Sequence, residues 1–202
     1  MSAQTNKKPN IRKLTTIAVM SAIGARLMFV EFPIPFLIPA FVKFDFSELP
    51  ALLATFVFGP TAGVSVCLIK NLIHLLITKS AGIGELSNFV LGATFVYIAG
   101  LIYKRNKSRK AALIACITGA VAMAIVCIPL NYYIIYPAYA KMFGGMDKII
   151  AAYEEINSKA TSLLTALVLS NVPFTLLKGI SVSVITFLIY KPLSPILKGE
   201  KS

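Results

Sequence analysis

The stretch ELPALLATFVFGPTAGVSVCLIKNLIHLL (48–76) decides how many times the chain can cross a membrane. It is apolar over almost its whole length, but Gly59-Pro60 interrupts it near the middle. A Gly-Pro pair is a strong turn signal, and proline inside a helix removes a backbone hydrogen bond. We therefore predict two helices, 49–58 and 61–78, joined by a tight turn.

The chain as a whole has the composition of an integral membrane protein. Its 202 residues are 57% hydrophobic and only 14% charged, and its mean hydropathy is +0.79. A spanning helix needs about 20 apolar residues. Four further apolar stretches approach or exceed that length: 14–30, 86–103, 111–137 and 162–190. The sequence thus predicts an all-α bundle of six transmembrane helices in a single domain, residues 1–202.

The positive charges indicate the orientation of this bundle. Four Lys and Arg residues lie in the tail 1–13, five in the loop 104–110 and three in the tail 191–202, together 12 of the 20. Such residues accumulate on the cytoplasmic side of a membrane. Six helices put these three segments on one side, whereas five would not. We predict that both termini are cytoplasmic and that a lipid bilayer, and no nucleic acid, explains the net charge of +12.

Two segments on the predicted outer side are unusual for loops. Residues 31–48, EFPIPFLIPAFVKFDFSE, are rich in Pro and Phe. This loop either lies on lipid headgroups or folds inward over a ligand cavity, where protein can bury its irregular backbone. Residues 138–161 carry apolar side chains at helical spacing, which predicts a short amphipathic helix.

A few polar side chains interrupt the apolar spans. In the last span, Asn171, Thr175 and Lys178 share one helix face. A lysine at mid-membrane costs about 2.5 to 3.5 kcal/mol on insertion scales, so it marks a functional site by default. Asn131 ends the fifth span and Asn88 opens the fourth. Any one of them alone could be an interhelical contact, but their similar depth predicts a site for a small polar molecule.

Recognised catalytic motifs are absent from the sequence. It contains no HExxH, GxSxG or GxxxxGK[ST], so we predict that the protein is no enzyme and binds no ATP itself. Cys67, Cys116 and Cys127 lie in apolar runs without metal-ligand spacing, which predicts buried thiols and no metal site.

A proton relay is conceivable on the third span, where Lys70 and His74 are one turn apart. Ion-coupled transport usually needs a carboxylate within the membrane. The nearest acids are expected at or beyond the outer helix ends: Glu31, Asp45, Glu48 and Glu85. We therefore disfavour the relay.

Four segments together resemble the riboflavin-specific S components of energy-coupling factor (ECF) vitamin transporters. They are FPIPFLIPAFVKFDFSELPALLATFVFGPTAGVSVCLIKNLIHLL (32–76), SNFVLGATF (87–95), LNYYIIYPAY (130–139) and PFTLLKGI (173–180). The resemblance implies a six-helix protein of the bacterial plasma membrane that captures riboflavin from outside. It also implies three partners, one transmembrane T component and two ABC-type ATPases, which supply the missing ATP chemistry.

The resemblance also implies a flavin pocket between the 31–48 loop and the outer halves of the last three spans. Asn131 and Lys178 match its positions, and Thr175 stands where a relative can carry asparagine. Asp45, Phe46 and Asn88 lie in matching motifs without an assigned contact. No cofactor is implied, because riboflavin is the cargo, and binding of flavin mononucleotide (FMN) stays open. We hypothesise that the polar part of the flavin holds Lys178, aided by an acid such as Asp45.

Small residues mark one face of the first helix, where Ala18 and Ala22 are four residues apart. Such faces let helices approach closely, and usually this is internal packing. The resemblance implies instead that they meet the T component. Two other functions remain open: an S component for another vitamin, such as thiamine or biotin, and a stand-alone secondary carrier or channel.

Overall fold

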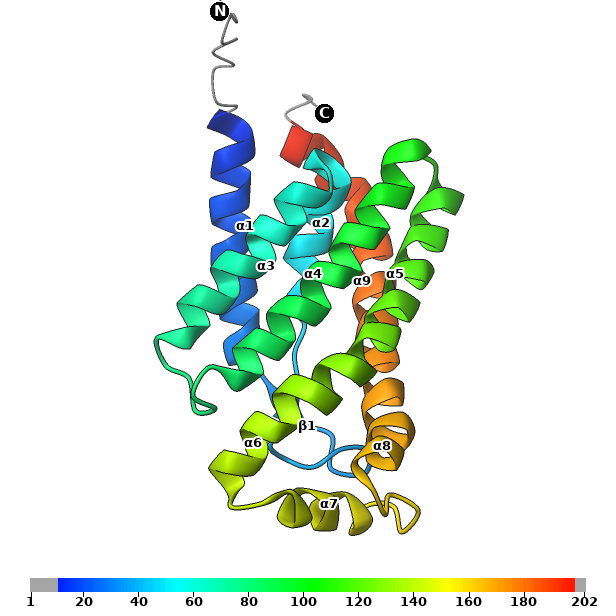
Figure 1. Ribbon diagram of the computed structural model, residues 1–202. Coiled ribbons are helices and arrows are strands. Elements are labelled where there is room, and N and C mark those ends of the chain that lie inside the picture. The colour runs from blue at the N-terminus through cyan, green and yellow to red at the C-terminus, as the bar shows by residue number, and fades with distance from the viewer. Residues whose placement is uncertain (1–10, 199–202) are drawn as a thin grey trace, which may run out of the picture.

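The computed structural model describes the backbone of residues 11–198 and the side chains of residues 11–190. It is a helical bundle with a small two-stranded ribbon (Figure 1). In chain order its elements are α1 (Ile11–Phe29), β1 (Phe32–Pro33), β2 (Lys43–Phe44), α2 (Glu48–Phe58), α3 (Pro60–Leu75), α4 (Ile83–Arg105), α5 (Arg109–Leu130), the π-helical turn η1 (Asn131–Ile135), α6 (Tyr136–Phe143), α7 (Met146–Glu154), α8 (Leu163–Ala166), the π-helical turn η2 (Leu167–Asn171) and α9 (Val172–Lys198).

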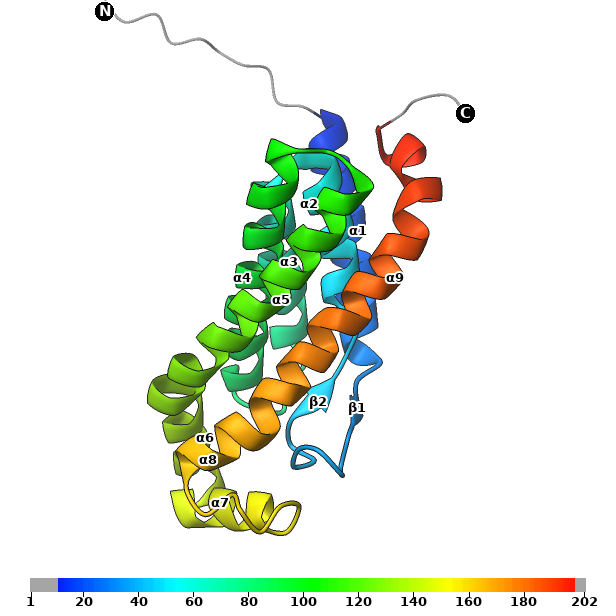
Figure 2. The same ribbon diagram turned by 90° about the vertical axis from the view of Figure 1, so that its right-hand side faces the viewer.

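The predicted break at Gly59-Pro60 is confirmed. Helix α2 ends at Phe58, and Pro60 begins α3, where its missing N–H costs no helical hydrogen bond. Gly59 joins them with a φ of 91°, a conformation that favours glycine. With 11 residues, α2 is only about 16 Å long, against the roughly 30 Å of a bilayer core. The β1–β2 ribbon continues below it toward the other end of the bundle (Figure 2).

Two long helical rods complete the bundle. One runs from Arg109 to Phe143 and includes η1; the other runs from Leu163 through η2 into α9. Each π-helical turn lies two residues from a proline, Pro129 or Pro173, which cannot donate a backbone hydrogen bond. Such wide turns frequently occur at functional sites. Here they carry Asn131 and Asn171, two of the polar residues within the spans.

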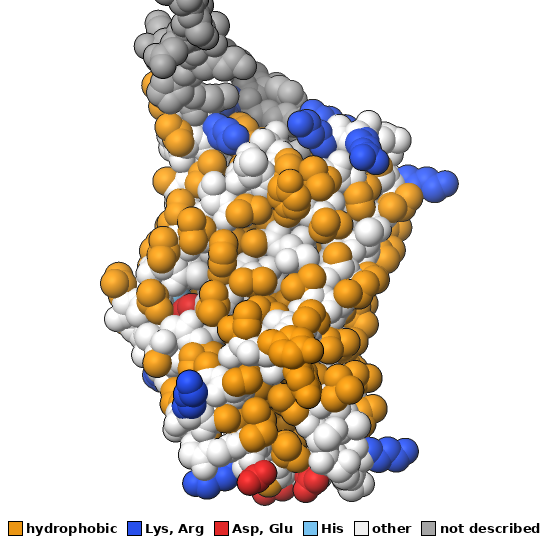
Figure 3. All heavy atoms as spheres, viewed as in Figure 1, with side chains coloured by type: hydrophobic (Ala, Val, Ile, Leu, Met, Phe, Trp, Pro, Cys, Tyr) orange, Lys and Arg blue, Asp and Glu red, His pale blue; other side chains and the backbone are white. Residues whose placement is uncertain are grey.

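Three helices in the described part are long and apolar enough to cross a membrane: Ile83–Arg105, Arg109–Phe143 and Leu163–Tyr190. Hydrophobic side chains cover the middle of the molecule, whereas Lys and Arg side chains lie toward both of its ends (Figure 3). The protein is therefore a membrane protein with a mostly helical fold.

The two ends of the bundle differ in what they contain. The start of α1, the α2–α3 turn, the α4–α5 loop and the end of α9 lie at one end, while the ribbon and α7 lie at the other (Figures 1 and 2). The start of α1, the α4–α5 loop and the end of α9 thus share one end of the bundle, which is the arrangement that an even number of crossings would give. The terminal segments of both predicted tails, 1–10 and 199–202, lie outside the described residues. The remaining parts are helical, because α1 begins at Ile11 and α9 continues to Lys198.

The 31–47 loop folds inward. Ile38 and Phe44 are almost fully buried and pack in one apolar cluster with Tyr136 and Tyr153 of α6 and α7. The structure thereby favours the cavity interpretation of this loop over the headgroup one. The short amphipathic helix predicted within 138–161 is confirmed as α7, which buries Ile149 and Tyr153.

Candidate ligand-binding site

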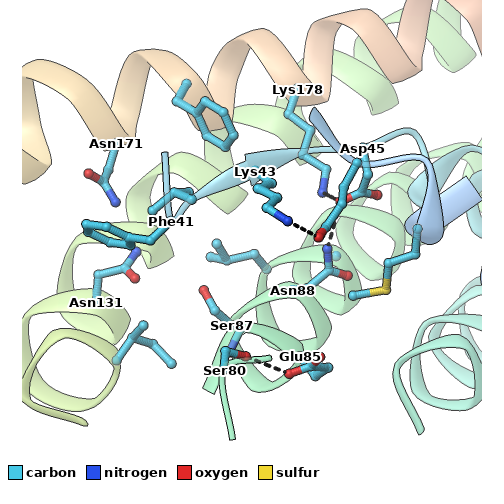
Figure 4. A pocket seen from close by; sticks show the side chains of 18 of the residues that line it. Phe41, Lys43, Asp45, Ser80, Glu85, Ser87, Asn88, Asn131, Asn171 and Lys178 are labelled. Atoms are coloured by element: carbon cyan, nitrogen blue, oxygen red, sulfur yellow. Dashed lines mark hydrogen bonds and ion pairs between the residues drawn. The ribbon is translucent and has the colours of Figure 1, made fainter. Parts of the chain in front are cut away.

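A cavity of about 430 Å³ lies beneath the inward-folded loop. Its size falls in the range of about 300 to 1,000 Å³ that is usual for small-molecule sites. Its walls are formed by helix α4, the rod containing η1, the rod containing η2, part of the 31–47 loop, the α3–α4 connection and the adjoining ends of α1, α2 and α3. A close view shows polar side chains pointing in from several of these elements (Figure 4).

Five of the six predicted site residues line this cavity: Asp45, Asn88, Asn131, Thr175 and Lys178. Their predicted convergence is therefore confirmed, whereas their binding of a ligand stays a prediction. Phe46 lies outside the lining. Its ring packs against those of Phe44 and Phe32, at centroid distances of 5.2 and 6.4 Å.

At one end of the cavity Lys178 is paired with two acids. Its Nζ donates to Asp45 Oδ2 at 2.8 Å and lies 3.0 Å from Glu48 Oε2, in an ion pair without hydrogen-bond alignment. Asn88 Nδ2 also donates to Asp45 Oδ2. Asp45 and Glu48 are only 3% and 2% exposed. Both acids lie at the end of a helix, as predicted, because α2 begins at Glu48. The sequence did not predict their burial inside the bundle, where the loop carries them.

A second lysine completes this charged cluster, which we define as Asp45, Glu48, Lys70 and Lys178. Lys70 is wholly buried, and its Nζ donates to Glu48 Oε1 at 2.9 Å, to Asn88 Oδ1 at 2.8 Å and to Ser47 Oγ. Two lysines and two carboxylates balance in charge. Burial raises the pKa of Asp45, but the charges of Lys178 and Lys70 outweigh it and hold that pKa well below its usual range. Asp45 is therefore an anion.

His74 belongs to a separate polar group. Its Nδ1 lies 2.8 Å from Glu85 Oε1, while Glu85 Oε2 accepts hydrogen bonds from Thr78 and Ser80 at 2.9 and 3.0 Å. These residues join the end of α3 to the start of α4. Although Lys70 and His74 are one turn apart, they bind different carboxylates, so the structure gives them no shared relay partner.

The opposite end of the cavity is lined by amides. Asn131 Nδ2 donates to Cys127 O at 2.8 Å and contacts Cys127 Sγ at 3.1 Å, and Thr175 Oγ1 donates to the same sulfur at 3.3 Å. Figure 4 shows Asn131 and Asn171 together, away from Lys178 and Asp45. Between the two ends the walls are apolar, with Leu91, Met123, Ile135 and Phe174 among the lining residues.

The family description "ECF transporter, substrate-specific component" matches residues 12–190. The chain belongs to this family. It is an S component. A solved structure described as "Structure and mechanism of the S component of a bacterial ECF transporter" superimposes on it with a TM-score of 0.75 at 35% identity, covering 94% of this chain and 99% of that one.

Two curated relatives extend this likeness along nearly the whole S component. "Riboflavin transporter RibU" of Staphylococcus aureus (strain TCH60) is 38% identical over 187 residues, 93% of each chain. "Riboflavin transporter FmnP" of Bacillus subtilis (strain 168) is 34% identical over 198 residues, 95% of this chain and 97% of that one. These relatives are transporter components and not enzymes.

The alanines predicted as a partner face lie on the outside of the S component. Ala18 and Ala22 are exposed, whereas the opposite face of α1 buries Ile17, Met20 and Gly24 against α2 and α3. Within the described part of the chain they are therefore not buried in a helix contact, which argues against the internal-packing interpretation.

Sequence reasoning missed two functional candidates of this S component. Glu48 was assigned to the outer end, although it pairs with both lysines. Asn171 was grouped with the polar residues of its helix face but was not assigned to the flavin pocket, yet it lines the cavity. Its spacing to Thr175 and Lys178 was the available signal, because three polar residues at i, i+4 and i+7 point into the same space.

Proposed function

We propose that this S component binds riboflavin from outside the cell for ATP-driven import. One observation carries the proposal: riboflavin transporters share 34 to 38% identity with the chain over 93 to 95% of its length. At such coverage the whole binding region is included, because the cavity residues lie between Met28 and Lys178.

The chemistry of the cavity supports a flavin. An isoalloxazine ring is flat, apolar at one end and edged by C=O and N–H groups at the other, which suits apolar walls followed by asparagines. A ribityl chain carries hydroxyls that can both donate and accept. Such hydroxyls suit the charged cluster, because they can accept from Lys178 and donate to Asp45 without adding charge to a balanced group. FMN would add a phosphate dianion beside a cluster whose charges already balance, so we propose riboflavin as the preferred ligand.

The test of ligand identity is the variant Lys178→Met. Methionine keeps much of the stem volume but removes the donor, so riboflavin hydroxyls lose a partner. Leaving buried hydrogen-bonding groups of the ligand unpaired costs about 1 to 3 kcal/mol, so we expect riboflavin affinity to fall about five- to 150-fold. Lumiflavin, which has no ribityl chain, should lose less. Fluorescence-quenching titrations of the purified protein with both ligands, and with FMN, measure this.

The matched control is Lys43→Met, which removes a lysine at the cavity wall whose partner is the partly exposed Glu31. It should change riboflavin affinity little. Unchanged riboflavin affinity in Lys178→Met would remove Lys178 from the site. A purified protein that is colourless and binds thiamine or biotin would overturn riboflavin as the cargo.

We further propose six spans in the bacterial plasma membrane with both termini in the cytoplasm. Parity and the basic 104–110 loop support this orientation. In a variant without the three native cysteines, Lys107→Cys should resist a membrane-impermeant thiol reagent in intact cells, and Ser158→Cys should react. Both positions are exposed, and a substitution at Lys107 leaves the neighbouring N-cap of α5, Ser108, intact. The reverse labelling pattern would contradict the orientation.

The proposed partners are a T component and two ABC-type ATPases, which belong to the general arrangement of ECF transporters. The exposed Ala18 and Ala22 support α1 as the contact surface for the T component. A close helix–helix contact needs small residues there, since interhelical packing in lipid depends on close approach.

A further inference from the structure

Asn171 takes part in a closed ring of hydrogen bonds beside the cavity. Its Nδ2 donates to Tyr136 Oη at 2.8 Å, Tyr153 Oη donates to its Oδ1 at 2.7 Å, and the two tyrosine hydroxyls bond each other. The three residues come from η2, α6 and α7. All are at least 96% buried, but only Asn171 and Tyr136 line the cavity.

The ring uses half of the amide. An asparagine side chain has two N–H groups and two carbonyl lone pairs. One of each is bound to the tyrosines, so one N–H and one lone pair remain. Because the amide is hydrogen-bonded to two hydroxyls at once, its plane cannot rotate freely. A buried amide with a fixed orientation is preorganised to bind a ligand.

Asn131, by contrast, has no N–H to offer. Its two Nδ2 hydrogens face the carbonyl oxygen and the sulfur of Cys127. Its Oδ1 accepts no hydrogen bond from the residues that the structure describes, so Asn131 contributes an acceptor. The Thr175 proton is also engaged, by Cys127 Sγ. The amide end therefore needs its donor from elsewhere.

We propose that Asn171 is a specificity-determining residue that supplies this donor, and that Tyr136 and Tyr153 are positioning residues for its amide. Asn171 lies close to Asn131, since it bonds Tyr136, five residues further along the same rod. An acceptor beside a donor matches the N–H and adjacent C=O of the flavin ring edge. The ring N–H donates to Asn131 Oδ1, and a neighbouring carbonyl accepts from Asn171 Nδ2. This inference rests on the proposed flavin ligand.

The experiment compares lumiflavin with its 2-thio and 4-thio analogues, because a thiocarbonyl is a poorer acceptor than a carbonyl. The unmodified protein should bind one analogue more weakly than lumiflavin, by roughly fivefold or more. Asn171→Leu should bind lumiflavin roughly tenfold more weakly and lose this discrimination. Each ratio is measured within one protein, so a general loss of folded protein cancels.

A second variant tests the positioning role. Tyr153→Phe removes a hydroxyl that does not line the cavity, and it should weaken lumiflavin and reduce the discrimination. Adding it to Asn171→Leu should cause no further loss, since the amide is already gone. Tyr190→Phe is the matched control: it breaks another tyrosine pair, Tyr103–Tyr190, at the far end of the bundle, and should leave the ratio unchanged.

The outcomes separate the two proposals. Full discrimination in Asn171→Leu, with flavin bound by the unmodified protein, would overturn the role of Asn171 and leave the function standing. An effect of Tyr153→Phe equal to that of Tyr190→Phe would overturn the positioning role. Failure of the unmodified protein to bind any flavin would overturn the proposed function and this inference with it.

Discussion

Ala18→Trp is expected to abolish riboflavin uptake by cells while leaving riboflavin binding by the purified S component intact. Ala18 is exposed on α1 among the residues that the structure describes, so an indole there can extend outward from the helix. A close helix contact with a T component would be forced apart. Overpacking costs about 1 to 3 kcal/mol, or roughly five- to 150-fold in assembly affinity. Uptake of labelled riboflavin and co-purification of partners measure the two effects.

Ile117→Trp provides the matched control for this prediction. Ile117 is 54% exposed on α5, on the opposite side of the bundle from α1 in Figure 1. A tryptophan at this position faces lipid, so uptake should persist. Ala22→Trp should behave as Ala18→Trp does. Loss of riboflavin binding in the alanine variants would assign these residues to the fold of the S component instead of a partner surface.

The second large effect is expected from Lys70→Met, in the centre of the charged cluster. The variant leaves Asp45 and Glu48 with Lys178 as their one remaining cation in the cluster. Removing one partner of a buried ion pair typically costs about 3 to 5 kcal/mol, because an uncompensated charge stays buried. The midpoint of thermal unfolding in detergent should fall strongly. Because Lys70 does not line the cavity, protein that remains folded should bind riboflavin better than Lys178→Met does.

A second substitution tests whether charge balance is the cause. Glu48→Gln in the Lys70→Met background restores a one-to-one cluster of Asp45 and Lys178, so part of the stability should return. Lys43→Met breaks a pair whose side chains are 33% and 29% exposed and should cost at most about 1 kcal/mol. A Lys70→Met protein no less stable than Lys43→Met would contradict the importance of the cluster.

Several features of the protein follow from the sequence alone. Gly59-Pro60 ends one helix and begins the next whatever the tertiary surroundings, because the constraint acts on the local backbone. Asn171, Thr175 and Lys178 share a face because a helix has 3.6 residues per turn. The apolar lengths and the positions of the basic residues likewise predict a membrane bundle and the parity of its ends. Each of these properties depends on neighbours a few residues away.

Only the tertiary structure decided where the acids lie and what they bind. Asp45 is 133 residues from Lys178, and Glu48 is 22 residues from Lys70. Periodicity gives the face of a helix but neither its depth nor the partner opposite. Asp45 and Glu48 are buried because the 31–47 loop packs Ile38 and Phe44 inward. Their charges are tolerated there because two lysines from other helices meet them, and the same packing leaves Phe46 beside the cavity and holds Asn171 between two tyrosines.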